Sequence, residues 1–332
     1  MNILITSIGK RVQVIKHLKE SFKIIGVDAC SETAAKEFVD VFRVISKIND
    51  EERYINDLIA ICKKEKVKAI IPLYEEEFPI LVKNKKKFED IDVTLVLSDE
   101  EIINICKSKT MTFHYFKDRN LKVPYIYKSS EIDEIIENTH KLKMPLIIKP
   151  DCGMGSNNVF KAKNINELKF FKNYVKNSIV QQFIKGDEYT VDVLTDFEGN
   201  PIYIIPRLRI EVRAGEVVKS KTVNNNEIIE ETKKVISYLN ENNKICRGPL
   251  TIQFIIDEKK MIYLLEINTR FGGGVPLSFK SGADYGKLIY KMLNGDHCNY
   301  IKNFNEVYMY RFDDAVYEEV GINFNNDKSN NI

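Results

Sequence analysis

Short runs of β-branched and apolar residues alternate with helical stripes in the N-terminal part of the chain. Four runs have the length and composition of buried strands, at residues 2–6, 23–27, 69–72 and 93–97. Between them, apolar side chains recur every three or four positions, which is typical of amphipathic helices. This alternation predicts βαβ units on a parallel sheet.

The clearest strand pair later in the chain is a hairpin. Two apolar runs, 250–256 and 261–268, flank a polar turn, which predicts two antiparallel strands. Because alternate residues of a strand share a face, Glu266 and Asn268 point the same way. Both interrupt a surface otherwise made of Ile, Leu and Phe. A buried hairpin is the alternative, but each of these polar side chains would then need a partner.

The opposite strand adds a third oxygen-bearing side chain. With an even number of residues in the turn, Gln253 lies opposite Leu264 and diagonal to Glu266 on the same face. Gln253, Glu266 and Asn268 then form an oxygen set suited to Mg²⁺, which proteins usually hold with one or two carboxylates plus substrate phosphates. A nucleotide would have to supply the remaining ligands of the ion. Arg270 would then lie beside the charged group that the nucleotide transfers.

A second pattern suits phosphate. The apolar run 146–148 predicts a buried strand that ends at Lys149, and a loop containing Gly153, Gly155 and Ser156 follows. Successive free N–H groups in such a loop bind phosphate oxygens, and the lysine adds a positive charge. The loop is not a Walker A motif, which requires a different spacing and a Lys-Ser/Thr ending.

Two further predicted strands carry charged residues on one face. Glu188 and Asp192 alternate with apolar residues on the first strand, and Arg207 and Arg209 do so on the second. A solvated sheet surface is the alternative. The position between the other two patterns favours a cleft that gathers anions, and from the basic group we single out Arg209 together with Lys221.

Composition favours a small-molecule partner. The chain has 332 residues and a net charge of only +2, so no global field indicates nucleic acid or a membrane surface. The six cysteines and four histidines are scattered, which argues against a zinc site or a disulfide framework. No apolar run approaches the length of a membrane span. We expect a cytoplasmic protein with reduced thiols.

Two features near the N-terminus leave alternatives open. The turn around Gly9, Lys10 and Arg11 lacks the glycine fingerprint of dinucleotide-binding folds, which makes a nicotinamide enzyme a weak hypothesis. These residues either bind an anionic group or form a tight turn with solvated charges. The acidic triplet 75–77 either lines a ligand site or opens a helix, and the helix is favoured.

The residues Glu266, Asn268 and Arg270 spell E-x-N-x-R after a strand that carries Gln253. Together with Lys149 and its glycine loop, this order resembles the ATP-grasp enzymes. It is most similar to single-module proteins related to the synthetase domains of the carbamoyl phosphate synthetase large subunit. The resemblance covers most of the chain.

The resemblance implies an α/β architecture with an ATP-grasp fold. An N-terminal Rossmann-like, or pre-ATP-grasp, parallel-sheet domain would span residues 1–108. A small α+β lobe with the lid loop would span 109–186, and a larger antiparallel-sheet α+β lobe with the metal site would span 187–322. Residues 323–332 are expected to be disordered on composition.

The resemblance also implies roles for site residues. Lys109 and Lys149 would contact the nucleotide phosphates, and Glu188 would receive the ribose hydroxyls. Backbone groups of one short segment would clamp the adenine, namely Gln181, Gln182, Phe183 and Ile184. One or two Mg²⁺ ions, with Mn²⁺ as a substitute, would bind at Gln253, Glu266 and Asn268. Arg270, Arg209 and Lys221 would act on the substrate.

The implied activity is ATP-dependent joining of a carboxylate to an amine. The acid, expected to resemble an amino acid, would become an acyl phosphate before an amine forms the amide and releases phosphate. The partners would be small molecules, with no nucleic acid or membrane, and the family's habit implies a homodimer. The neutral Gln253, where the wider superfamily usually has Glu, supports a rival hypothesis: a nucleotide-binding regulatory subunit without turnover.

Overall fold

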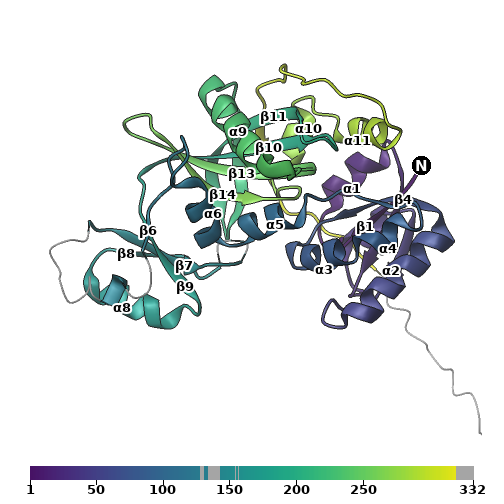
Figure 1. The fold of residues 1–332 in the computed structure, drawn as a ribbon, viewed down its shortest axis with the longest axis horizontal. Helices are drawn as coiled ribbons and strands as arrows, with labels where there is room; N and C mark the ends of the chain where they lie inside the picture. Colours follow the sequence, from purple (N-terminus) through teal and green to yellow (C-terminus); the bar gives the residue numbers. More distant parts are fainter. Residues whose placement is uncertain (128–130, 134–142, 154, 156, 319–332) are drawn as a thin grey trace, which may run out of the picture.

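The computed structural model describes residues 1–127, 131–133, 143–153, 155 and 157–318, and these residues form three sheets (Figure 1). The predicted disordered segment 323–332 lies outside the described residues. The predicted combination of a parallel N-terminal sheet with antiparallel sheets is confirmed. The domain boundaries at residues 108 and 186 stay predictions.

The N-terminal sheet is parallel and has five strands in the order β3-β2-β1-β4-β5. The strands are β1 (Asn2–Thr6), β2 (Lys23–Asp28), β3 (Val41–Val44), β4 (Val67–Pro72) and β5 (Thr94–Leu95). Three of the predicted runs form strands close to their expected bounds. The run 93–97 forms only the two-residue β5, and β3 was not predicted.

Helices cover both faces of this sheet. Leu4 of β1 packs in one apolar cluster with residues of α2 (Glu51–Glu65), α3 (Phe78–Lys83) and α4 (Lys85–Glu89). Ile3 and Ile5 point to the other face, because alternate strand residues do. There they pack with α1 (Val12–Lys19) and α11 (Tyr285–Leu293), so a helix from the C-terminal part of the chain covers the N-terminal sheet (Figure 1).

The smaller antiparallel sheet has the order β6-β9-β7-β8. Its strands are β6 (Ile126–Tyr127), β7 (Leu146–Pro150), β8 (Phe160–Ala162) and β9 (Ser178–Gln182). Helix α8 (Ile165–Tyr174) packs on it through the buried Leu168. In Figure 1 this lobe projects away from the N-terminal sheet, at the lower left.

The larger antiparallel sheet has six strands in the order β14-β13-β10-β11-β12-β15. They are β10 (Gly186–Thr195), β11 (Pro201–Arg213), β12 (Glu216–Thr222), β13 (Gly248–Asp257), β14 (Ile262–Asn268) and β15 (Tyr308–Tyr310). One face is apolar and packs on α5 (Glu100–Lys107), α6 (Lys109–Phe116) and α9 (Asn226–Leu239). Polar residues of the alternate positions therefore gather on the other face.

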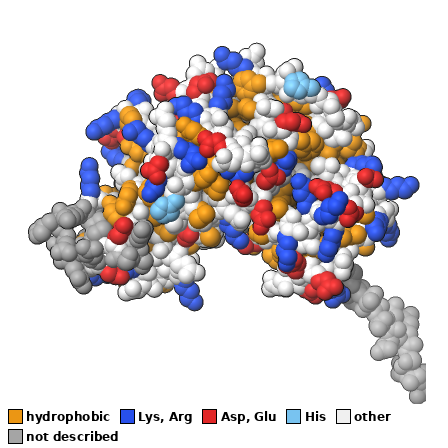
Figure 2. Space-filling view, viewed as in Figure 1, with side chains coloured by type: hydrophobic (Ala, Val, Ile, Leu, Met, Phe, Trp, Pro, Cys, Tyr) orange, Lys and Arg blue, Asp and Glu red, His pale blue; other side chains and the backbone are white. Residues whose placement is uncertain are grey.

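The remaining short elements are α10 (Pro276–Lys280) and the 3-10 turns Ala34–Phe38, Glu75–Glu77 and Glu241–Asn243. Among the described residues, no helix combines the length and the apolar character needed to cross a bilayer. Basic and acidic side chains are interspersed over the face shown in Figure 2, in keeping with the small net charge.

Candidate active site

The β13–β14 hairpin brings Gln253 directly opposite Glu266. The predicted register was wrong, because Ile256 pairs with Ile262 and the turn between them has an odd number of residues. A bulge at Leu265 then adds one residue to β14. Such an insertion re-aims the side chains beyond it. The carboxylate and the amide therefore lie closer together than the diagonal pairing would have placed them.

Asn268 and Arg270 extend this polar surface. Asn268 Nδ2 donates to Glu266 Oε1 at 3.1 Å, and Arg270 Nη2 donates to Asn268 Oδ1 at 3.3 Å. Arg270 Nε also lies 2.8 Å from Glu75 Oε1 of the N-terminal domain. The acidic triplet does form a helical turn, as favoured from the sequence, but its first residue also contacts the site.

The donor set fits a hard cation. Glu266, Gln253 and Asn268 offer one carboxylate and two amide groups, and oxygen ligands of this kind suit Mg²⁺ when phosphates complete the shell. Within the described part of the chain, no group of three or more His, Cys, Asp or Glu could hold a metal ion. A metal at this place therefore depends on the amides and on a bound phosphate.

Strand β7 carries Lys149 into the site from the smaller sheet. Burial and, to a smaller extent, the nearby Lys109 lower the pKa of Lys149 to about 8, although the Glu266 carboxylate opposes this shift. Lys109 begins α6, and its Nζ donates to the carbonyls of Asp151 and Gly153 at 3.3 and 3.5 Å. Lys109 thus contacts the glycine loop, and Lys149 lines the same cavity as that loop.

These groups line one cavity of about 630 Å³ to which the two antiparallel sheets and the N-terminal domain contribute. Of the site residues predicted from the sequence, the following line it: Lys109, Lys149, Gly153, Gly155, Gln181, Gln182, Phe183, Ile184, Glu188, Arg209, Gln253, Glu266, Asn268 and Arg270. Ser156 lies outside the described residues. Lys221 does not line the cavity.

Lys221 faces away from the site. It pairs with Leu208 across the β11–β12 ladder, so it shares the face opposite to Arg207 and Arg209. Its Nζ lies 2.7 Å from Glu306 Oε2. The sequence also indicates this orientation, because counting outward from a two-residue turn at Ala214 and Gly215 places Lys221 opposite Leu208.

Arg209 lies inside the cavity and is paired. Its Nε is 3.3 Å from the carboxylate of Glu188, the residue expected to meet the ribose. Burial lowers the pKa of the Arg209 guanidinium, and the Glu188 carboxylate opposes this shift. Glu188 and Arg209 therefore form one charged edge of the cavity where the two strands meet.

Several residues that line the cavity were not selected from the sequence. They are Thr190, Arg207, Glu216 and Thr251, together with Asn157, Asn158 and Cys152 of the loop. Arg11 belongs to the turn whose role was left open. It lines the cavity, whereas the neighbouring Lys10 is exposed to solvent. Burial lowers the pKa of Arg11, and the positive charge of Arg270 lowers it further.

Comparison with known proteins places this geometry in a family. Residues 106–274, about half of the chain, match the family model described as an ATP-grasp domain. Residues 3–96 match the model described as a PylC-like N-terminal domain.

Two relatives match parts of the sequence. The D-alanine–D-alanine ligase of Buchnera aphidicola subsp. Schizaphis graminum is 32% identical over 174 residues, which cover 48% of this chain and 56% of the relative. The carbamoyl phosphate synthase large chain of Caldanaerobacter subterraneus subsp. tengcongensis is 25% identical over 296 residues, which cover 81% of this chain. The match spans only 26% of that relative.

A solved structure has the same fold. It is the biotin carboxylase domain dimer of Hydrogenobacter thermophilus 2-oxoglutarate carboxylase, in complex with MgADP, ADP and bicarbonate. The TM-score is 0.71 with 18% identity, and the match covers 92% of this chain and 73% of that one. The family match over half of the chain, supported by this shared fold, shows that the chain belongs to the ATP-grasp family.

Proposed function

We propose that this protein is an ATP-dependent ligase that joins a small carboxylic acid to an amine. The observation that carries the proposal is that a single cavity is lined by Lys109 and Lys149 on one side and by Glu266, Asn268 and Arg270 on the other. Groups suited to phosphate and groups suited to a metal ion therefore line the same cavity. The similarity to a D-alanine–D-alanine ligase supports an acid that resembles an amino acid.

The nucleotide would lie along the cavity from β9 to β14. The adenine would meet the backbone of residues 181–184, where Lys161 lies 3.7 Å from the centre of the Phe183 ring. Glu188 would accept hydrogen bonds from the ribose. Lys109 and Lys149 would neutralise phosphate oxygens, and at low effective dielectric each such contact is worth several kcal/mol.

Gln253, Glu266 and Asn268 would hold Mg²⁺. When bound, this ion would neutralise negative charge on the phosphates. Arg270 would orient and stabilise the transferred phosphoryl group, because it lies beside Asn268 and is fixed by Glu75. A carboxylate oxygen of the acid attacks the γ-phosphorus, the bond to the β-phosphate oxygen breaks, and ADP leaves. An amine then attacks the acyl carbon of the acyl phosphate, and the bond from that carbon to the phosphate oxygen breaks. Phosphate leaves, and the amine nitrogen loses a proton to solvent.

Release of ADP with a panel of acid and amine pairs tests the proposal. We expect one pair to increase ADP release and Glu266→Gln to abolish that increase while the fold is kept. A well-folded protein that binds MgATP but forms no ADP with any pair would instead support the nucleotide-binding regulatory subunit. ADP formation that survives Glu266→Gln would remove Glu266 from the metal site.

A further inference from the structure

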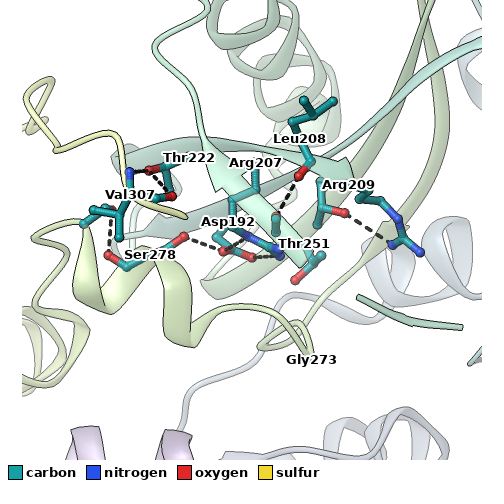
Figure 3. A network of polar contacts seen from close by, with 12 residues as sticks. Asp192, Arg207, Leu208, Arg209, Thr222, Thr251, Gly273, Ser278 and Val307 are labelled. Carbon is teal, nitrogen blue, oxygen red and sulfur yellow. Dashed lines mark hydrogen bonds and ion pairs between the residues drawn. The ribbon is translucent and has the colours of Figure 1, made fainter. Parts of the chain in front are cut away.

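Arg207 is buried in the polar face of the larger sheet and is held by Asp192. Its side chain is 1% exposed, and its Nε and Nη2 donate to the two carboxylate oxygens of Asp192 at 2.6 and 3.0 Å. The Ser278 hydroxyl donates to the same carboxylate (Figure 3). This bidentate pair fixes the plane of the guanidinium group.

The third nitrogen of Arg207 is not satisfied by this arrangement. Arg207 Nη1 is buried and has no hydrogen-bond partner among the described residues. Arg207 lines the cavity, and a Cβ placed on Gly274 would lie 2.4 Å from Nη1. A buried donor without a partner raises the free energy of the folded protein. Arg207 has two nitrogens held by Asp192 and a third that an anion could satisfy.

Arg207 lies against the glycine segment that follows β14. A Cβ on Gly274 would lie 2.4 Å from Arg207 Nη1, and a Cβ on the preceding Gly273 would lie 2.4 Å from Glu216 Oε2. Arg207 and Glu216 belong to the larger sheet, whereas Lys149 belongs to the smaller sheet. The Arg207 nitrogen is therefore next to the glycine segment and Glu216.

We propose that Arg207 Nη1 binds a carboxylate oxygen of the acid substrate, and that Asp192 and Ser278 position it for this contact. The inference rests on the proposed ligase function and adds a substrate-binding residue to it. An acid held there would lie beside the Gly272–Gly274 backbone, next to Arg270 and the metal-binding side chains, where the phosphoryl group has to arrive.

Two variants and one control separate this role from a structural one. Arg207→Lys keeps a positive charge against Asp192 but cannot reproduce the planar fork. Gly274→Ala keeps the side chains of both Arg207 and Asp192 and places a methyl group 2.4 Å from Nη1, so the methyl group and the guanidinium must move apart. The backbone of Gly274 is not in the left-handed region. Arg213→Lys is the matched control, because Arg213 lies on the same strand but is exposed and does not line the cavity.

Calorimetric titration of acetate and of D-alanine into protein saturated with MgADP tests the proposal without turnover. We expect the wild-type and Arg213→Lys proteins to bind at least one of these carboxylates, and Arg207→Lys and Gly274→Ala to bind it about tenfold or more weakly. Thermal melting checks that each variant is folded. Absence of carboxylate binding by the wild-type protein, or equal binding by the folded variants, would overturn the proposal.

The γ-phosphate is the other oxyanion that Arg207 could meet. If Arg207→Lys binds MgADP normally but binds the complex of Mg²⁺ with a non-hydrolysable ATP analogue more weakly, the nitrogen belongs to the γ-phosphate and the proposal is wrong. Unchanged affinity for both nucleotides supports the carboxylate. Failure of the ligase function is a separate result, because it would appear as absent ADP release while carboxylate binding still depended on Arg207.

Discussion

Arg270 Nε lies 2.8 Å from Glu75 Oε1, so an ion pair joins the segment after β14 to the turn after β4. Their side chains are only 10% and 17% exposed. Burial raises the pKa of Glu75, while Arg270 holds it down. The pair therefore links the N-terminal sheet to the strand that carries Glu266 and Asn268, and it fixes the arginine beside the proposed transfer site.

Replacing Glu75 by Gln should lower both stability and activity. The change removes the negative charge that faces Arg270, which we expect to cost about 2 kcal/mol of unfolding free energy, somewhat less than the loss of one charge from a fully buried pair. Glu76→Gln is the matched control, since Glu76 pairs with Lys107 nearer the surface, where such pairs contribute about 0–1 kcal/mol. Urea denaturation of both variants measures the difference, and equal losses would contradict a special role for Glu75.

Glu77 should make the stability of the protein depend on pH. Burial raises the pKa of this carboxyl group from 4.5 to about 7, although the hydroxyls of Ser7 and Thr6 donate to it and oppose the shift. The folded protein therefore binds this proton more tightly than the unfolded chain does. The resulting stabilisation is fully present below pH 4.5 and is lost as the pH rises through 7, a change of about 3 kcal/mol at 1.36 kcal/mol for each pH unit.

Glu77→Gln isolates this contribution. The variant has no titrating group at residue 77, whereas all other titrations are shared with the wild-type protein. The wild-type unfolding free energy should therefore fall relative to that of the variant between pH 5 and pH 8, as measured by chemical denaturation. A difference that stays constant over this range would show that Glu77 does not hold its proton in the folded protein.

Much of the architecture could be predicted from periodicity. The apolar runs at β1, β2 and β4 are buried on both faces, so their composition alone marks them. The short β3 has no fully buried residue and gave no such signal. The hairpin was predicted, but its register was not. A bulge such as that at Leu265 is set by what the strand packs against, and a one-residue slip changes which side chains face each other.

The choice between two arginines on one strand shows the same limit. Arg207 and Arg209 have equivalent places in the alternating pattern, and the sequence favoured Arg209. Their environments differ because Asp192 lies beside Arg207 on the neighbouring strand and Glu188 beside Arg209. That pairing depends on the register of β10 with β11, which no local pattern reveals.

Lys149→Met should weaken nucleotide binding without a comparable loss of stability. The lysine is buried with a pKa lowered to about 8, so its charge costs desolvation in the free protein and is compensated when a phosphate binds. Methionine has a similar length and no charge. We expect the Kd for MgATP to rise about tenfold or more, with thermal melting of the free protein unchanged or slightly raised.

Lys163→Met is the control for Lys149, because Lys163 is an exposed lysine of the same lobe that does not line the cavity. Its nucleotide affinity should match that of the wild-type protein in a calorimetric titration. If Lys149→Met binds MgATP as tightly as Lys163→Met does, Lys149 has no contact with phosphate.

Gly215→Ala should disturb the glycine loop, whose residue Gly155 lines the cavity. Gly215 lies at the turn between β11 and β12 with φ of +78°, and a Cβ there would lie 2.2 Å from the carbonyl oxygen of Gly155. Gly295 has a nearly identical φ of +79° but open space around its Cβ position. Both alanine variants should lose about 1 kcal/mol of unfolding free energy because of the left-handed backbone.

Only Gly215→Ala must also push the glycine loop away, and Gly155 of that loop lines the cavity together with Lys149. The affinity for MgADP should therefore fall in Gly215→Ala and stay unchanged in Gly295→Ala, while urea denaturation shows similar stability losses. Equal affinities would mean that the turn and the loop move independently when nucleotide binds.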